Sequence, residues 1–333
     1  MIMKKITLFL IAILSLAACK GGHKTLLPNV SGKAGEVIVV MDKDNWEGNL
    51  GVAVRELLAC DCPFLPQVEP LYSLVSVTPG GFADLFKVHR NIVIFDISAD
   101  KEKGEVSYLQ DIWASPQCVI NVTAPSSESA IETLEANGRN VVNAIEQAER
   151  DRVIRNSIKY EAREIAPQVS EIFGGSPHFP SGYKLKKKTD NFVWIADEKQ
   201  YTIQGVLIYS YPAELAEEFT LDSIIEHRNA VFKENVPGMF DGTYMTTSTA
   251  VKPELEYLRY KGRDLTQTRG YWEVENDYMG GPFVSHSFYS PDGMNIIVAE
   301  AFVYAPKYDK RQYLRQVESI LYSWEWAEKK TEN

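Results

Sequence analysis

The sequence contains few cysteines, four among 333 residues. Three of them, Cys60, Cys62 and Cys118, lie in the body of the chain, and an odd number of thiols leaves one unpaired however the others pair. The Cys60-Asp61-Cys62 stretch lacks the two-residue spacer of thioredoxin-type motifs and has no His or Cys partners at zinc spacing. We therefore expect these cysteines to be structural, as one disulfide or as buried thiols.

The chain also lacks an excess of positive charge. It has 35 Lys and Arg residues against 45 Asp and Glu residues, a formal net charge of -10. Binding to nucleic acid requires clustered positive charge that neutralises phosphates. The composition therefore excludes nucleic acid from the expected partners.

Signatures of catalysis and of cofactor binding are missing as well. The five histidines are scattered singly, and no glycine pair continues into a phosphate-binding pattern. Ser176 precedes His178 closely, but "GGSPH" is not the nucleophile elbow of hydrolases. Glu273, Glu275 and Asp277 would share one face of a continuous strand, where a solvated acidic edge is favoured over a calcium site. The sequence predicts no catalytic residue, no metal and no cofactor.

Long hydrophobic runs are absent except at the N-terminus. There, Lys4 and Lys5 precede an uncharged stretch over residues 6–18, which is shorter than the roughly 20 residues that span a bilayer and is typical of a secretory signal. The stretch closes with "LAAC", the pattern of the bacterial lipobox. We expect cleavage between Ala18 and Cys19, with lipid attached to Cys19.

The predicted lipid implies that the membrane is a partner and that the chain after Cys19 lies outside the cytoplasm. Several acyl chains hold a protein far more firmly than one. "KGGH" follows Cys19 with no acidic residue, so signals for inner-membrane retention or for surface export are not present. We expect a signal peptide over residues 1–18, a lipid-anchored tether over residues 19–34, and attachment to the outer membrane facing the periplasm.

Patterning predicts a mixed α/β (α+β) fold with two domains, each a sheet with packed helices, joined by a long helical segment. We expect an N-terminal α/β domain over residues 35–125, the helical segment over 126–175 and an aromatic-rich α+β domain over 180–328. In the first domain, β-branched runs predict strands at 36–42, 72–77, 91–98 and 118–125, and a helix at 50–59. In the second, we expect strands at 183–195 and 203–210, a helix at 221–234, a β meander with a turn at 290–293, and a terminal helix at 309–324.

The helical segment contains two places where we expect a break. The charged stretch "ERDR" at 149–152 interrupts the apolar stripe, which predicts a break near Arg150. Pro167 predicts another near the end of the segment, because proline disrupts a helix interior.

A hairpin is readable over residues 254–274. Gly262-Arg263 fits a two-residue turn with glycine in the first central position. This register sets Glu256 opposite Arg269, an opposite-charge pair that supports it.

The same hairpin mixes aromatic and charged side chains, whereas a structural strand usually alternates apolar and polar residues. Aromatic planes beside charged groups suit sugars and peptide termini. We therefore expect a ligand surface here; the alternative is an edge hairpin made polar against aggregation. Its candidate residues are Tyr257, Arg259, Tyr271, Trp272 and Glu273.

Three local stretches carry a resemblance: "HRNIVIFDIS" (89–98), "WASPQCVINVTAP" (113–125) and "AERDR" (148–152). With the lipobox, they make the chain resemble a Bacteroidetes-type lipoprotein family known only as a domain of unknown function. That resemblance implies no catalytic residues. Separately, the C-terminal meander followed by an amphipathic helix is similar to the Mog1/PsbP-like α/β/α sandwich, an architecture that implies no activity.

The sequence as a whole predicts an outer-membrane-anchored, periplasm-facing lipoprotein that serves as a non-catalytic binding or interaction module. Its candidate partners besides the membrane are an envelope glycan, peptide or protein. The alternative is an envelope hydrolase acting on glycan or peptide.

Overall fold

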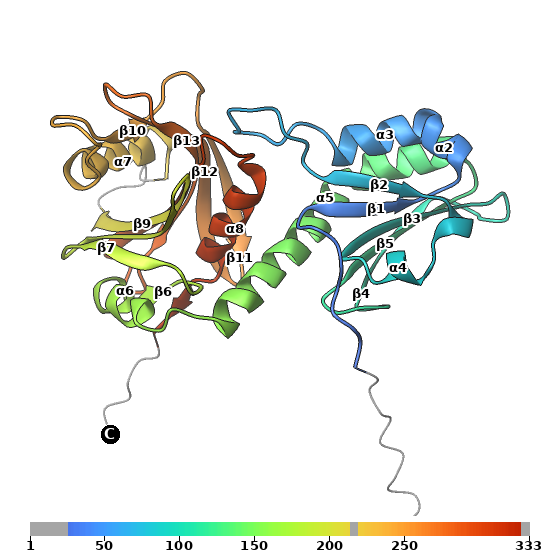
Figure 1. Cartoon of the computed structure of the whole chain (residues 1–333), viewed down its shortest axis with the longest axis horizontal. Helices are drawn as coiled ribbons and strands as arrows, with labels where there is room; N and C mark the ends of the chain where they lie inside the picture. The colour runs from blue at the N-terminus through green and yellow to red at the C-terminus, as the bar shows by residue number, and fades with distance from the viewer. Residues whose placement is uncertain (1–25, 214–218, 328–333) are drawn as a thin grey trace, which may run out of the picture.

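The computed structural model describes residues 26–213 and 219–327 as two domains of mixed α/β structure joined by a long helix (Figure 1). This confirms the predicted fold class. The predicted signal peptide, Cys19 and the start of the tether lie outside the described residues. Among the described helices, none is both long and apolar enough to cross a membrane.

The N-terminal domain is built on a five-stranded sheet in the order β2-β1-β3-β5-β4. All neighbours are parallel except β4, which pairs antiparallel with β5 at one edge. Four of these strands were predicted. Strand β4 was not, because its sequence does not alternate apolar and polar residues, and in the structure its side chains are mostly exposed. The strands are β1 (Glu36–Val40), β2 (Ser73–Val77), β3 (Asn91–Ile97), β4 (Glu105–Gln110) and β5 (Cys118–Ala124).

Both faces of this sheet are covered, which explains the continuous apolar run of β1. Val37 and Val39 pack with α3 and α5 on one face. Ile38 and Val40 pack on the other, near Phe82. The helices are α2 (Lys43–Glu47), α3 (Asn49–Leu58), the 3-10 turn η1 (Pro79–Gly81), α4 (Asp84–Lys87) and α5 (Ser127–Lys159).

Helix α5 runs without interruption through Arg150, so the break predicted there is wrong. The charged residues that interrupt its apolar stripe are buried: Glu149 is 1% and Arg152 is 8% exposed. They make polar contacts with the first sheet, which offset the cost of burying them. The helix ends at Lys159.

The second predicted break, near the end of the segment, is present, but it lies before Pro167. The chain leaves α5 after residue 159 and starts α6 (Ile165–Phe173) at residue 165. Pro167 therefore lies in the first turn of α6, where a proline removes no intrahelical hydrogen bond.

The C-terminal domain is a half-barrel of eight antiparallel strands. The order is β10-β12-β13-β14-β9-β8-β7, and β11 also pairs with β12. Side chains from α6 and α8 pack on one face, and α7 packs on the other. The elements are β7 (Lys184–Lys188), β8 (Phe192–Lys199), β9 (Thr202–Pro212), α7 (Leu221–Asn235), β10 (Met245–Thr247), β11 (Glu254–Tyr260), β12 (Arg263–Val274), β13 (Gly280–Tyr289), β14 (Asn295–Tyr304), α8 (Arg311–Tyr322) and the small pair β6 (Gly175–Ser176) and β15 (Glu325–Trp326).

The β11–β12 hairpin has a different register from the predicted one. Its central turn residues are Lys261 and Gly262, both with positive φ (47° and 81°), as a type I′ turn requires. Glu254, and not Glu256, lies opposite Arg269. The predicted turn is therefore wrong, because glycine takes the second central position.

The second hairpin turns where the sequence predicts. β13 ends at Tyr289 and β14 begins at Asn295. The backbone N–H of Ser290 donates to the carbonyl of Asn295 at 2.8 Å, closing the turn over residues 290–293.

The three described cysteines are free thiols, so the disulfide alternative is not realised. Cys60 is exposed, Cys62 half-buried and Cys118 buried. Burial raises the pKa of both Cys62 and Cys118 to about 11. These two thiols are therefore protonated at neutral pH and are poor nucleophiles.

Candidate functional site

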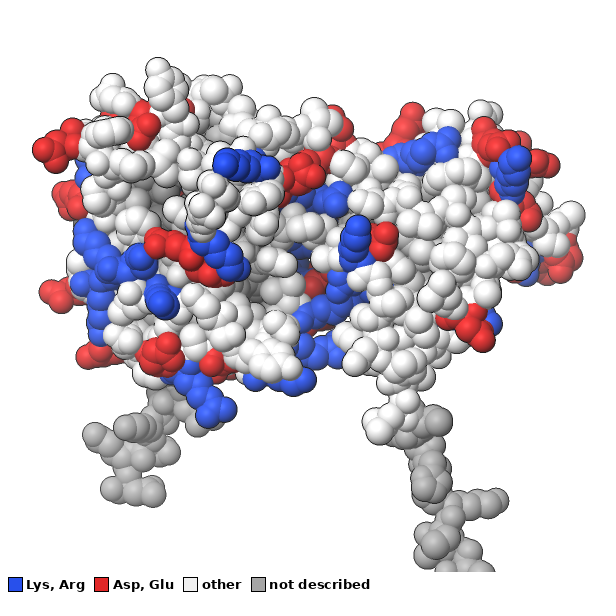
Figure 2. Space-filling model, viewed as in Figure 1, with Lys and Arg blue, Asp and Glu red and all other residues white. Residues whose placement is uncertain are grey.

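The two domains meet where the C-terminal half of α5 packs against α8, and a cleft opens on either side of this contact. Basic side chains gather along the junction between the lobes on the face shown in Figure 2. We call the larger cleft, of about 630 Å³, the arginine cleft and the smaller, of about 520 Å³, the amide cleft.

Polar contacts between the domains hold the walls of these clefts in place. Glu69, in a loop of the N-terminal domain, accepts hydrogen bonds from the backbone N–H groups of Lys310 (2.6 Å) and Arg311 (3.0 Å). It thereby caps the first turn of α8, which has no side-chain cap of its own. Arg315 of α8 also donates to Glu146 of α5. Both clefts are therefore preformed.

Helical spacing explains how α5 lines the arginine cleft. Arg139, Asn143, Glu146, Gln147 and Arg150 border it, and steps of three and four residues place side chains on one face of a helix. The facing wall comes from α8, the floor from the β11–β12 hairpin, and one rim from the loop after α3. Helix α8 contributes Arg311, Leu314, Arg315, Glu318 and Tyr322. The hairpin contributes Glu256, Leu258, Arg259, Tyr260, Gln267 and Arg269. The loop contributes Cys62, Pro63 and Leu71.

Positive charge exceeds negative charge in this cleft, with six arginines against three glutamates. Arg269 pairs with Glu318 at 2.5 Å, and Arg315 pairs with Glu146 at 2.6 Å. Arg259 lies 3.6 Å from the exposed Asp264. Among the described residues, three arginines of the cleft have no carboxylate within ion-pair distance: Arg139, Arg150 and Arg311.

Arg150 reaches from α5 across to the second domain. Its guanidinium carbon lies 3.6 Å from the centre of the Tyr322 ring and 5.7 Å from that of Tyr260. One terminal nitrogen donates to Gln147 at 3.0 Å. A guanidinium has five N–H donors, so the stacked group keeps several of them for a ligand.

Of the three arginines, Arg311 is the one whose positive charge is disfavoured by its surroundings. Its side chain donates only to neutral groups, the carbonyl of Pro70 and the hydroxyl of Ser73. Burial and then the neighbouring charge of Arg315 lower the pKa of Arg311. Its buried Nε has no partner in the described structure. An anion placed here would relieve both costs.

His286 lies beneath the floor of the cleft, where the nearby arginines disfavour its protonated form. Its Nε2 accepts from Gln267 at 3.1 Å, and its ring contacts Tyr322 edge to face at 4.5 Å. Burial, followed by the charges of Arg150, Arg263 and Arg269, holds the pKa of His286 well below its usual value. This histidine is therefore neutral in the folded protein at neutral pH.

The neutral His286 makes stability depend on pH. An unfolded histidine binds a proton below about pH 6.5, whereas the folded one does not, so the free energy of unfolding should fall as the pH falls from 6.5 towards 5. One proton corresponds to at most about 1.4 kcal/mol per pH unit. Urea unfolding at several pH values should show a shallower decline in the His286→Gln variant. Equal slopes in the two proteins would contradict this assignment.

The structure does not bring the predicted ligand surface together, because Trp272 belongs to the core. Its side chain is 2% exposed, its Nε1 donates to the carbonyl of Val303 at 3.3 Å, and its ring packs edge to face on Phe302. The expectation of an exposed Trp272 is therefore wrong. Tyr271 and Glu273 are half-buried and lie on the part of β12 that pairs with β13 rather than with β11.

The two remaining residues of that set are on the outer hairpin. Tyr257 is 69% exposed, and its hydroxyl donates to the carbonyl of Phe219 at 3.0 Å. Arg259 borders the arginine cleft. Of the five predicted residues, Arg259 alone lines either described cleft.

Neither of the weaker sequence patterns forms a site in the described residues. β12 ends at Val274 and the chain turns at Asn276, so the three acidic residues do not continue one strand. No group of three His, Cys, Asp or Glu residues there is arranged to hold a metal ion. The ring of His178 lies between the carboxylates of Glu161 (2.6 Å) and Glu325 (3.3 Å), and its backbone N–H, not its ring, contacts a serine hydroxyl, that of Ser323 (2.9 Å).

Sequence reasoning missed the unpaired arginines of the cleft. The available signal was the interruption of the α5 stripe, together with polar residues spaced by three and four from Arg139 to Arg150. A second signal was the pair Arg311 and Arg315 in the terminal helix. Nothing in the sequence indicates that these two helix faces meet.

Two models of domains of unknown function match the chain, one on each side of the end of α5. DUF8532 matches residues 30–158 and DUF4837 matches residues 162–323. The predicted resemblance to domains of unknown function is thus confirmed, while lipidation and the Mog1/PsbP-like similarity stay predictions. No curated protein matches the chain.

Solved structures give only distant likenesses. A protein from Bacteroides thetaiotaomicron matches at 12% identity and a TM-score of 0.26, over 47% of this chain and 46% of its own. This chain therefore spans less than half of that protein's length. The lipid transfer and protein localization domain of human StarD13 (DLC2) matches at 10% identity and a TM-score of 0.23, over 43% of this chain and 89% of its own. Neither likeness carries an argument about this protein.

Proposed function

We propose that this chain is a non-catalytic binding protein of the bacterial envelope, and that its arginine cleft binds an anionic ligand. The observation that carries the proposal is the group of three arginines without carboxylate partners, Arg139, Arg150 and Arg311, in a preformed cleft between the domains. The chain as a whole is acidic, with a net charge of -10. The positive cleft is therefore a local feature that attracts anions.

The chemistry of the cleft favours phosphate or carboxylate groups. Guanidinium groups present a planar fork of donors that matches the oxygens of either anion. An envelope glycan or peptide that carries such groups is the ligand class we propose. The lipid on Cys19 would hold this cleft near the outer membrane, on the periplasmic side.

The hydrolase alternative has no comparable support. Among the described residues, no serine or cysteine lies within hydrogen-bond distance of a histidine ring nitrogen. The thiol that borders the cleft, Cys62, has its pKa raised to about 11 by burial.

The Arg150→Gln variant tests the proposal with inorganic pyrophosphate as the probe. We expect the full-length protein in detergent to bind pyrophosphate, and the variant to bind about tenfold more weakly, because a hydrogen bond to a charged group is lost. Isothermal titration calorimetry measures both affinities, and the wild-type affinity should fall as salt is added.

A matched control is Arg163→Gln, which removes an exposed arginine outside both clefts. Its pyrophosphate affinity should equal that of the wild type. Equal weakening by the two substitutions would mean that pyrophosphate responds only to net charge, and the cleft would then have no special role. Absence of binding by the wild type would also reject the proposal.

A further inference from the structure

We propose that the amide cleft is a second binding site and that it takes a saccharide bearing a single carboxylate. This site lies across the α5–α8 contact from the arginine cleft and does not depend on the function proposed above. Two observations carry it: one positive charge in excess at the floor, and neutral hydrogen-bonding groups around it.

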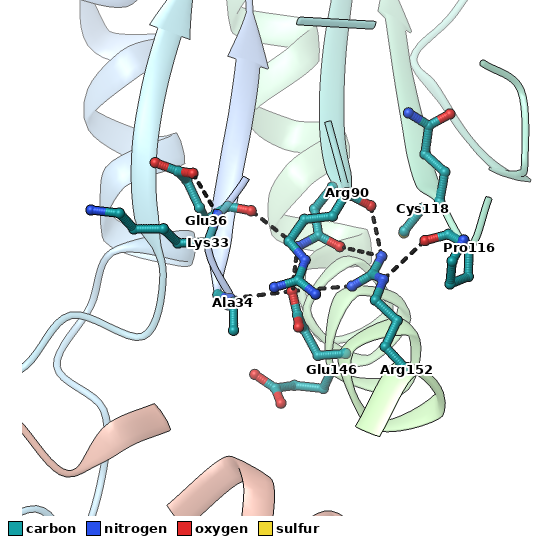
Figure 3. A network of polar contacts seen from close by, with 12 residues as sticks. Lys33, Ala34, Glu36, Arg90, Pro116, Cys118, Glu146 and Arg152 are labelled. Atoms are coloured by element: carbon teal, nitrogen blue, oxygen red, sulfur yellow. Dashed lines mark hydrogen bonds and ion pairs between the residues drawn. The ribbon is translucent and has the colours of Figure 1, made fainter. Parts of the chain in front are cut away.

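The floor is a group of two arginines, Arg152 buried and Arg90 half-buried, that share one carboxylate. Glu149 lies 3.5 Å from Arg90 and 3.1 Å from Arg152, and the side chains of both arginines reach into one polar network (Figure 3). The Glu149 carboxylate also accepts hydrogen bonds from the side-chain amide of Asn91 at 2.7 Å and from the backbone N–H of Gly35 at 3.2 Å. Two guanidinium groups and one carboxylate leave one positive charge without a counter-ion, which is costly at a buried position.

Arg90 is the arginine available to a ligand. Arg152 donates to three oxygens of the protein, the carbonyls of Pro116 (2.9 Å) and Arg90 (2.6 Å) and the side chain of Asn91 (3.0 Å). Arg90 pairs with Glu149, with Nε as the closest atom, but neither Nε nor the two terminal nitrogens make a hydrogen bond to protein in the described structure. These two nitrogens form a fork that suits one carboxylate.

The other charges of the cleft cancel in pairs. Asp197 lies 2.9 Å from Lys199, and Arg315 is paired with Glu146. The excess at this site is therefore a single charge, which distinguishes it from the arginine cleft and favours a monoanion over a polyanion.

Neutral polar groups make up the rest of the binding surface. Nε2 of Gln204 donates to Oε1 of Gln316 at 3.3 Å, which leaves an acceptor on Gln204 and a donor on Gln316. The side chains of Asn156 and Ser181 line the same cleft and have no protein partner in the described part of the chain. Groups that both donate and accept suit the hydroxyls of a sugar, and the volume of about 520 Å³ falls within the usual range for small ligands.

Ligand-observed NMR titrations of the full-length protein in detergent test this site with three probes: D-glucuronate, D-glucose and acetate. We expect glucuronate to bind about tenfold more tightly than either glucose or acetate, because it alone uses the arginine fork and the amides together. Arg90→Gln should abolish the preference for glucuronate over glucose while leaving glucose affinity unchanged. Asn156→Ala should weaken both sugars.

Arg163→Gln serves as the matched control, since it removes an exposed arginine outside both clefts and should leave glucuronate binding unchanged. The pyrophosphate test depends on Arg150 and the glucuronate test on Arg90, so a failure of one test does not decide the other. Equal affinity of the wild type for glucuronate and glucose, or no glucuronate binding up to about 10 mM, would overturn it. If Arg90→Gln does not fold, Arg90→Lys keeps the charge without the fork and should lose most of the preference; an unchanged preference would reject the site.

Discussion

Substitution of Cys19 by alanine is expected to move the protein completely from the membrane fraction to the soluble fraction. The prediction rests on the lipobox pattern that ends at Cys19. Each buried CH₂ of an acyl chain contributes about 0.8 kcal/mol to membrane attachment, so loss of all the chains removes the anchor. Fractionation of envelopes and labelling with a radioactive fatty acid measure the result.

Cys60→Ala is the matched control for this experiment, because Cys60 is an exposed free thiol in the folded body. That variant should keep both the label and the membrane attachment. A Cys19→Ala protein that still fractionates and labels like the wild type would show that the lipobox interpretation is wrong.

Loss of the buried charge on Glu300 is expected to destabilise the C-terminal domain by about 3–5 kcal/mol, the range typical of a broken buried ion pair. Arg228 of α7 donates to both carboxylate oxygens of Glu300 in β14, at 2.8 and 2.7 Å, and to Thr247 in β10 at 2.8 Å. Both charged residues are 0% exposed. Glu300→Gln keeps the shape of the side chain but leaves the guanidinium charge buried without a counter-ion. Urea unfolding measures the change.

Two further variants identify the cause of that loss. Asp264→Asn breaks the exposed pair with Arg259 and should change the free energy of unfolding by less than about 1 kcal/mol. The double variant Arg228→Met/Glu300→Gln should be more stable than Glu300→Gln alone, because no unpaired charge stays in the core. A double variant less stable than the single one would show that the loss comes from packing rather than from charge.

The preformed junction between the domains supports both proposed binding sites. Glu69 fixes the start of α8 to the N-terminal domain, and the Arg315–Glu146 pair fixes its middle to α5. Side chains that are already ordered lose less conformational entropy when a ligand binds. Helices α5 and α8 contribute lining side chains to both proposed sites, while Arg90 and Ser181 of the amide cleft come from loops.

The sequence by itself determined the identity of most elements and the fold class. Runs such as "EVIVV" and "CVINVTA" are short, apolar and rich in β-branched residues, which favours buried strands. The turn over residues 290–293 follows from its own Pro, Asp and Gly residues. These features are local, so a single chain segment contains the information that decides them.

The tertiary structure alone decided the hairpin register, the continuity of α5 and the position of both clefts. A two-residue slip leaves every side chain of a hairpin on the same face, so alternation could not separate Glu254 from Glu256 as the partner of Arg269. The charges at 149–152 led to the prediction of a helix break because their partners lie far away in the sequence, at the first sheet. The arginines of α5 and α8 form one cleft only because long-range packing brings two helix faces together, and no local pattern encodes that contact.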